Sequence, residues 1–199
     1  MRWFLILCVS LLAYGTYNKL SHRTVPHPVG VLTAQQDPEQ TDTGAAAFEH
    51  RGYKIQPLAE FSIKSRVLSV EHYSNGREAD LSPVDLAMGW GRMSDTAVIN
   101  QLQISQNNRF YFWHYENQPP IPTSEIISHS ANMHMIPASD AIEKVLKAVK
   151  PGEIVALSGQ LIEATASDGW RWKSSLTRED SGHGACEVIF VKEVSVSRE

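Results

Sequence analysis

The segment 140–163, DAIEKVLKAVKPGEIVALSGQLIE, decides the fold class of this chain. Its apolar residues first follow the i, i+3, i+4, i+7 spacing of an amphipathic helix; these residues are Ile142, Val145, Leu146 and Val149. Asp140 and Glu143 predict a capping box at the helix start, and the pair Pro151-Gly152 predicts its end. We therefore expect a helix that packs on the rest of the domain through all four apolar side chains.

Strand patterns lie on both sides of this helix. Residues 153–163 predict a strand that follows it directly, with Gly159 as a β-bulge. Alternating, β-branched or aromatic stretches predict the other strands; they cover residues 61–67, 101–105, 109–115, 125–135 and 187–196, with one more around Trp170 and Trp172. The polar residues 106–108 are expected to join two of these strands in a hairpin.

Two further short helices are expected after the first strand. The sequence Ser82-Pro83-Val84-Asp85 supplies an N-cap, a proline at the first helical position and an acid at the third. Ser94-Asp95 predicts the start of the second. The predicted fold class is therefore α+β, an antiparallel sheet or a small, partly open barrel with three short helices. A helix between the third and fourth strands resembles the oligonucleotide/oligosaccharide-binding barrel, from which the two extra helices depart.

The N-terminus predicts export from the cytoplasm. Arg2 precedes the apolar run 3–13, which suits the hydrophobic region of a signal peptide and is shorter than the ~20 residues of a comfortable transmembrane helix. Two alternatives stay open. The chain is either cleaved near Gly15, or keeps an anchor in which mild residues extend the hydrophobic span towards Lys19. Either alternative places the body outside the cytoplasm.

These patterns predict three parts of the chain. Residues 1–20 are a signal anchor or signal peptide, which puts a single hydrophobic helix in front of the domain. Residues 21–47, with three prolines and no periodicity, are expected to form a flexible linker. Residues 48–199 are then a single α+β domain of ordinary size.

Composition excludes several classes of protein. The net charge of −4 and a pI near 6.1 argue against a nucleic-acid partner, which requires a basic surface. Cys8 lies in the hydrophobic run, so Cys186 stands alone in the body and no intradomain disulfide or cysteine-rich zinc site is expected. His129 and His134 point to opposite faces of a strand, which weakens a two-histidine metal site. We expect no metal and no cofactor.

Two polar segments, 128–135 and 170–186, contain the candidate site residues. The catalytic candidates are His134, Ser175, Asp180 and His183, and the ligand-binding candidates are Asn132, Trp172 and Arg178. If there is a site, we expect it where the two segments meet, with His134 as base or ligand, Arg178 as anion anchor and Asp180 as orienting acid. The alternative is a structural network in which these groups satisfy one another. No complete catalytic motif is present.

Four stretches of the chain resemble those of an uncharacterised group of bacterial proteins with an N-terminal membrane anchor. They are 27–32 (HPVGVL), 82–95 (SPVDLAMGWGRMSD), 130–138 (SANMHMIPA) and 169–187 (GWRWKSSLTREDSGHGACE). The group has no assigned activity, so the resemblance supplies no catalytic residues. It implies attachment to the inner membrane with the body in the periplasm, or secretion if the N-terminal segment is cleaved.

Two functions are consistent with this sequence. The first is a membrane-tethered binding or accessory module of the cell envelope, which contacts a ligand or an envelope protein through the aromatic strand 109–115, Trp170 and Trp172. The second is a small envelope hydrolase that uses His134 or His183 with Asp180 or a serine. The tether and the incomplete catalytic motif favour the first function. The sequence therefore leaves open whether the chain is an enzyme, but it favours a protein that is not one.

Overall fold

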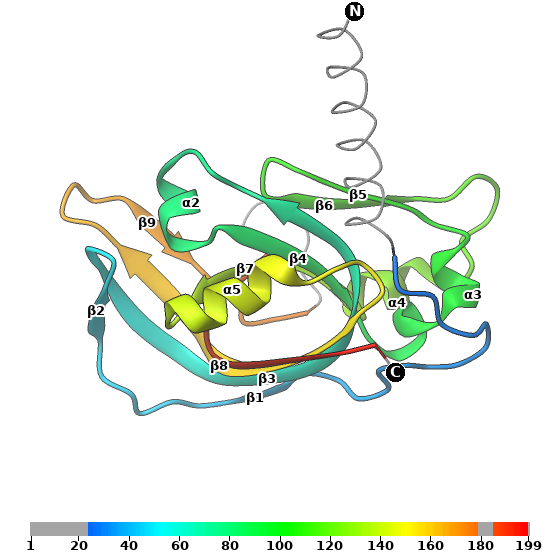
Figure 1. Cartoon of the computed structure of the whole chain (residues 1–199), viewed down its shortest axis with the longest axis horizontal. Helices are drawn as coiled ribbons and strands as arrows, with labels where there is room; N and C mark the ends of the chain where they lie inside the picture. The colour runs from blue at the N-terminus through cyan, green and yellow to red at the C-terminus, as the bar shows by residue number, and fades with distance from the viewer. Residues whose placement is uncertain (1–23, 179–184, 199) are drawn as a thin grey trace, which may run out of the picture.

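The computed structural model describes residues 24–178 and 185–198 (Figure 1). The predicted N-terminal hydrophobic segment, Asp180 and His183 lie outside these residues. The strands are β1 (Glu39–Thr41), β2 (Phe48–His50), β3 (Tyr53–His72), β4 (Val84–Gly89), β5 (Gln103–Asn107), β6 (Phe110–His114), β7 (Ser130–Pro137), β8 (Ile154–Thr165), β9 (Arg171–Lys173) and β10 (Glu187–Ser197). The helices are α2 (Arg77–Leu81), the 3-10 helix η1 (Gly91–Ser94), α3 (Thr96–Ile99), α4 (Thr123–Ser128) and α5 (Asp140–Ala148).

Five strands close into a ring. β3 pairs with β4, β4 with β7, β7 with β10, β10 with β8, and β8 returns to β3. Only the β7–β10 pairing is parallel. The 20-residue β3 closes the ring because its first part pairs with β8 and its last part with β4. The predicted α+β class with a sheet is confirmed.

Smaller elements surround this ring. β1 and β2 add to β3, β9 adds to β8, and β5 and β6 form a separate two-stranded sheet. Helices α3 and α4 gather at one end of the molecule, and α2, β2 and β9 at the other (Figure 1). The helix α5 packs against β7 and β10.

The interior of the ring is the main hydrophobic core. Alternate residues of each ring strand point inward, as the period of two requires. They include Phe61, Ile63 and Val67 of β3, Leu86 and Met88 of β4, Met133 and Met135 of β7, Leu157 and Leu161 of β8, and Ile189 and Val191 of β10. Leu146 and Val149 belong to the same core, so α5 is part of the packed domain.

The structure corrects two details of α5. Ser139 is its N-cap, because the Ser139 hydroxyl accepts a hydrogen bond from the Ile142 amide, so Asp140 does not open a capping box. Leu146 is fully buried and Ile142 half-buried, whereas 38% of Val145 is exposed. The prediction that Val145 packs inward was wrong, because the short helix meets the ring of strands along a narrow stripe.

The helix predicted from Ser82 is a strand. Residues 84–89 form β4, and the short helix α2 ends just before it, at Leu81. All six residues of β4 are buried, so the inward alternation of Val84, Leu86 and Met88 is masked by equally buried residues between them. The structure therefore has four α-helices and one 3-10 helix in the described residues, instead of the three predicted.

The strand predicted over 125–135 is only partly present. Residues 123–128 form α4, whose Ile126 is buried, and β7 begins at Ser130. His129 ends the helix and therefore does not lie on the strand with His134. The helix predicted at Asp95 is confirmed, since its carboxylate accepts a hydrogen bond from the Ala97 amide at 2.8 Å.

Gly159 permits a bulge in the neighbouring strand rather than forming one itself. The register of β10 slips between Val191 and Glu193, opposite Gly159 on β8. A Cβ atom on Gly159 would lie 2.0 Å from the Phe190 carbonyl oxygen, so only glycine allows the strands to approach this closely.

The described part of the predicted linker is bound to the body. The Val25 amide donates to the Pro151 carbonyl at 2.8 Å, and the buried Ala34 accepts a hydrogen bond from the Gly91 amide. β1 then pairs with β3. Residues 24–41 thus form a strap that backbone hydrogen bonds hold on the domain, where the sequence predicted a flexible linker. In the part of the chain described, no helix has the length and apolar character needed to cross a membrane.

Candidate functional site

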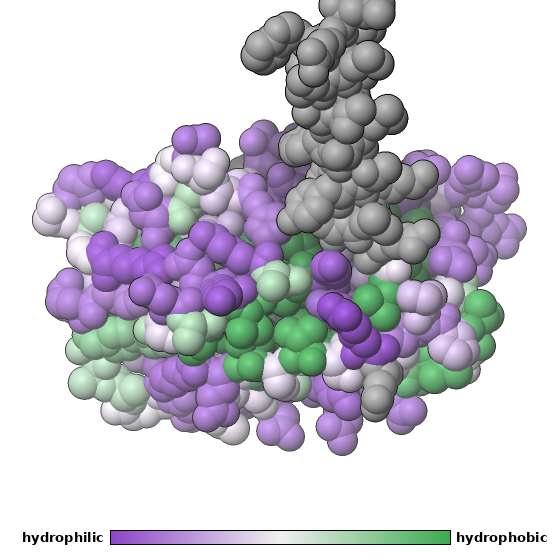
Figure 2. All heavy atoms as spheres, viewed as in Figure 1, coloured by the Kyte–Doolittle hydropathy of each residue, from purple (hydrophilic) through white to green (hydrophobic). Residues whose placement is uncertain are grey.

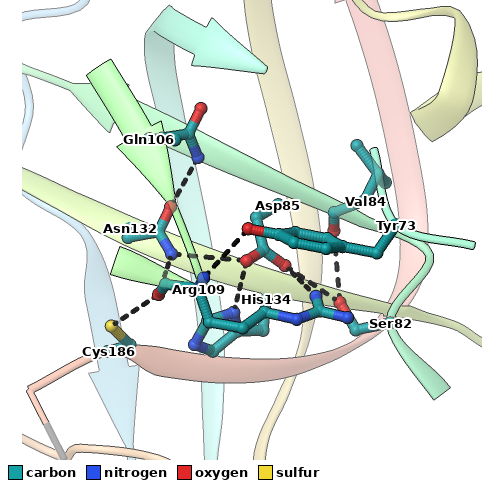
Figure 3. Close-up of polar contacts among 9 residues, drawn as sticks. All are labelled: Tyr73, Ser82, Val84, Asp85, Gln106, Arg109, Asn132, His134 and Cys186. Atoms are coloured by element: carbon teal, nitrogen blue, oxygen red, sulfur yellow. Dashed lines mark hydrogen bonds and ion pairs between the residues drawn. The ribbon is translucent and has the colours of Figure 1, made fainter. Parts of the chain in front are cut away.

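A buried polar network lies on the outer face of β4 and β7 (Figure 3). Asp85 and His134 are direct cross-strand neighbours, which brings His134 Nδ1 to 2.9 Å from Asp85 Oδ2. This is a short polar contact rather than an aligned hydrogen bond. Asn132, two residues away on β7, places its Nδ2 3.5 Å from the same oxygen. The Asp85 side chain is fully buried, so its charge must be balanced nearby.

Arg109 supplies that balance from the tip of the β5–β6 hairpin. Its Nη1 lies 2.6 Å from Asp85 Oδ1, and its guanidinium carbon lies 3.6 Å from the centre of the Tyr73 ring. Asn108 and Arg109 both have positive φ, 49° and 70°, the pattern of a two-residue type I′ turn. The predicted turn at 106–108 is therefore displaced, and Arg109 belongs to the turn rather than to the strand.

The backbone of Arg109 is bound as firmly as its side chain. Its amide donates to the Tyr73 hydroxyl at 3.0 Å, and its carbonyl accepts from Asn132 Nδ2 at 2.8 Å. These contacts compensate for the unfavourable left-handed conformation of a non-glycine residue. Gln106, also on the hairpin, donates to Asn132 Oδ1 at 2.6 Å. The network therefore clamps the hairpin onto the outer face of β4 and β7.

Trp172 of β9 covers the other side of the network. Its ring centre lies 4.7 Å from that of His134 and 5.6 Å from the Arg109 guanidinium carbon. The ring contributes to the burial of His134, which is 2% exposed. Ser82 completes the network, because its hydroxyl donates to Asp85 Oδ1 at 3.3 Å.

A cavity of about 130 Å³ lies beside the network. Phe110, Tyr111 and Trp113 of β6 form an aromatic wall, and Asn132 and Arg178 contribute polar groups. Ile127, Ser130, Ala131 and residues 185–187, at the start of β10, complete the lining. Asn132 thus belongs both to the buried polar network and to the cavity.

One donor of Arg178 has no acceptor in the part of the chain that the structure describes. Its Nη1 lies 3.1 Å from Glu187 Oε1, and its Nη2 donates to Gln40 Oε1 at 2.5 Å. Its Nε is buried and has no hydrogen-bond partner among residues 24–178 and 185–198. A buried donor in this state normally has a partner, so a ligand that accepts a hydrogen bond fits here.

Tyr111 is the most strongly perturbed group in the cavity. Burial of its ring raises the pKa of the hydroxyl to about 12, and the weak hydrogen bond to Ser130, at 3.4 Å, opposes this shift. Folding therefore favours the protonated hydroxyl.

This pKa predicts alkaline instability. We expect the free energy of unfolding to fall as the pH rises from about 10 towards 12, because the unfolded chain ionises Tyr111 at its ordinary pKa while the folded protein resists it. A pH titration followed by tyrosinate absorbance checks this. The Tyr111→Phe variant should lack the phase of tyrosine ionisation that occurs at the highest pH. If that variant leaves this phase intact, the assignment to Tyr111 is wrong.

The structure brings the two predicted polar segments together. Asn132 and Arg178 line the same cavity, and Trp172 packs on His134. Ser175 is used locally, because its hydroxyl donates to the Thr177 carbonyl at 3.1 Å. Asp180 and His183 lie outside the described residues.

The sequence interpretation missed the two charges at the centre of the network. The local pattern predicts a helix start at Asp85 and a strand at Arg109. The available signal was an acid inside the apolar alternation Val84, Leu86, Met88, a pattern that places a carboxylate on the outer face of a strand.

The described residues offer few of the contacts that catalysis requires. His134 contacts Asp85 and Trp172, and no serine hydroxyl in the described ranges is hydrogen-bonded to it. A base must reach its nucleophile within hydrogen-bond distance. The same residues contain no group of three or more histidine, cysteine, aspartate or glutamate side chains placed to hold a metal ion.

Comparison with known proteins identifies no relative of this chain. No family model, no curated protein and no solved structure matches the chain. The resemblance to a group of bacterial anchored proteins therefore stays a prediction.

Proposed function

We propose that this chain is a membrane-tethered binding module of the bacterial cell envelope, whose ligand enters the cavity between the β5–β6 hairpin and β7. The observation that carries the proposal is the cavity itself, which is lined by an aromatic wall, by Asn132 and by Arg178, whose Nε has no hydrogen-bond partner among residues 24–178 and 185–198. Ligand sites commonly combine apolar walls with a few polar groups that fix orientation.

The strand topology supports this location. We assign the ring to the oligonucleotide/oligosaccharide-binding type, because α5 lies between its third and fourth strands in sequence, β7 and β8, and because the third and fifth strands, β7 and β10, pair in parallel. In such barrels the second and third strands and the neighbouring loops hold the ligand. Here those strands are β4 and β7, which carry the buried network.

The size and charge of the cavity limit the ligand. At about 130 Å³ it is smaller than the roughly 300–1,000 Å³ of pockets that enclose a drug-sized molecule. A single sugar or side chain of a longer molecule is therefore the expected occupant. Arg178 is paired with Glu187, and the net charge of the chain is −4, so a neutral or weakly acidic glycan or peptide unit suits it better than a nucleic acid.

The setting of the module follows from the N-terminal sequence. Arg2 and the apolar run 3–13 support a single inner-membrane anchor with the body in the periplasm, or a secreted protein if cleavage occurs near Gly15. A module held in this way would present its cavity to a polymer or to a protein partner of the envelope.

Substitution of Arg178 tests the proposal. In saturation-transfer NMR of the full chain against soluble cell-wall glycopeptides and short peptides, we expect a bound fragment whose signal is lost in Arg178→Gln. The control is Arg171→Gln, which removes an exposed arginine paired with Glu163 outside the cavity and should leave binding unchanged.

Three outcomes would contradict the proposal. They are a panel without any binder, an equal loss of binding in Arg178→Gln and Arg171→Gln, and cleavage of the fragments by the protein. The last result would favour the hydrolase instead.

A further inference from the structure

A second surface, which shares no residue with the cavity, lies between α5 and the end of β10. It is a groove of about 680 Å³. Val145, Val149 and Val196 give it an apolar floor, and Lys144 and Arg198 stand at its rim. Figure 2 shows apolar side chains on this face, between α5 and the C-terminal end of β10, bordered by hydrophilic ones.

The apolar groups here are unusually exposed. Val145 and Val196 are 38% and 37% exposed. Two further exposed valines, Val29 and Val31, lie outside the groove, in a part of the strap where the Gly30 amide donates to Asp95 Oδ1. Two large apolar side chains exposed in one groove are typical of a surface that meets a partner.

The chain enters the body beside this groove. The Val25 amide is hydrogen-bonded to the Pro151 carbonyl, and His27 Nε2 lies 2.6 Å from the Gly152 carbonyl oxygen. Pro151 and Gly152 stand between the groove residues Val149 and Glu153. The predicted hydrophobic span ends by Lys19, only five residue steps before Thr24, a reach of at most about 18 Å. A membrane that holds this span is therefore close to the groove.

The charges around the groove match an acidic membrane surface. Lys147 is paired with Glu143, and Arg198 with Glu153. Lys144 and Lys150 have no acidic partner recorded among the described residues, so their charges remain available. Lysines near a bilayer are attracted to anionic headgroups, and small apolar groups between them enter the interface.

We propose that the groove between α5 and β10 rests on the headgroup layer of the membrane that holds the chain's own hydrophobic segment, with acidic phospholipids as its partner. This inference depends on the membrane tether proposed above. It fixes the orientation of the barrel on the bilayer, which a flexible linker would leave free.

Spin labels on the full chain test the proposal. The chain is reconstituted in vesicles of phosphatidylcholine and phosphatidylglycerol, with a nitroxide on a keto amino acid in place of Val196, so that both cysteines are kept. The matched control has the label in place of Phe112, which is 52% exposed and lies outside the groove. We expect the ratio of collisions with oxygen to collisions with a water-soluble nickel complex to be several-fold higher for the label at position 196 than for the label at position 112. The double variant Lys144→Glu, Lys150→Glu should abolish this difference.

The other outcomes separate the two proposals. If the chain floats with the vesicles but positions 196 and 112 behave alike, the tether stands and the docking surface is wrong. If the chain does not float, the tether fails and the docking surface with it. If position 196 is shielded from both reagents in detergent as well as in vesicles, protein rather than lipid fills the groove, and the proposal is overturned.

Discussion

Asp85→Ala is expected to destabilise the protein by about 3–5 kcal/mol, because it leaves the charge of Arg109, whose side chain is only 17% exposed, without a partner. The Asp85 side chain is fully buried, and it binds Arg109, His134, Asn132 and Ser82 at once. Its removal also releases the tip of the β5–β6 hairpin. Urea unfolding of the full chain in detergent, followed by circular dichroism, measures the loss.

An exposed ion pair supplies the control. Arg77 and Asp168 form a bidentate ion pair whose side chains are 38% and 53% exposed. Asp168→Ala should therefore lower the free energy of unfolding by about 1 kcal/mol or less. If Asp85→Ala lowered the free energy of unfolding no more than Asp168→Ala, the buried network would not be what holds the β5–β6 hairpin on β4 and β7.

Leu146→Ala should have the next largest effect, a loss of about 2–5 kcal/mol in the free energy of unfolding. Leu146 is fully buried and belongs to the main core, where α5 meets β7 and β10. Its truncation leaves a cavity that the surrounding strands cannot easily fill. Denaturant unfolding measures this loss as well.

The neighbouring residue gives a matched comparison. Val145 lies on the same helix but is 38% exposed, and Val145→Ala should change stability by roughly 0.5 kcal/mol or less. Equal losses for the two variants would mean that α5 is packed differently. A loss below about 0.5 kcal/mol for Leu146→Ala would mean that the helix is peripheral.

Local patterns predicted those elements whose faces differ in burial. The periodicity of 140–149 gave the helix α5, and alternation gave the strand over 61–67, because each has one buried side. The pattern failed for 84–89, where the hairpin and the network bury the outer face of β4 as well. A strand that is buried on both sides has no polar alternation to detect.

The site depended on long-range register. Asn132, Trp172 and Arg178 were named because their side chains suit binding, and the structure places all three at the network or the cavity. Asp85 acquires its role only when β4 pairs with β7, and Arg109 only when the turn takes positive φ. Neither event is encoded in a neighbouring residue, so local reasoning gave both charges other roles.

Photo-crosslinking in living cells tests most directly the central claim that the cavity is the ligand-contacting face. With benzoylphenylalanine in place of Phe110, which lines the cavity, we predict a crosslinked adduct that disappears in Arg178→Gln. The same group in place of Phe48, a partly buried phenylalanine packed on Phe190 outside the cavity, should give none. An adduct at Phe48 and none at Phe110, or an adduct at Phe110 that Arg178→Gln leaves unchanged, would contradict the account.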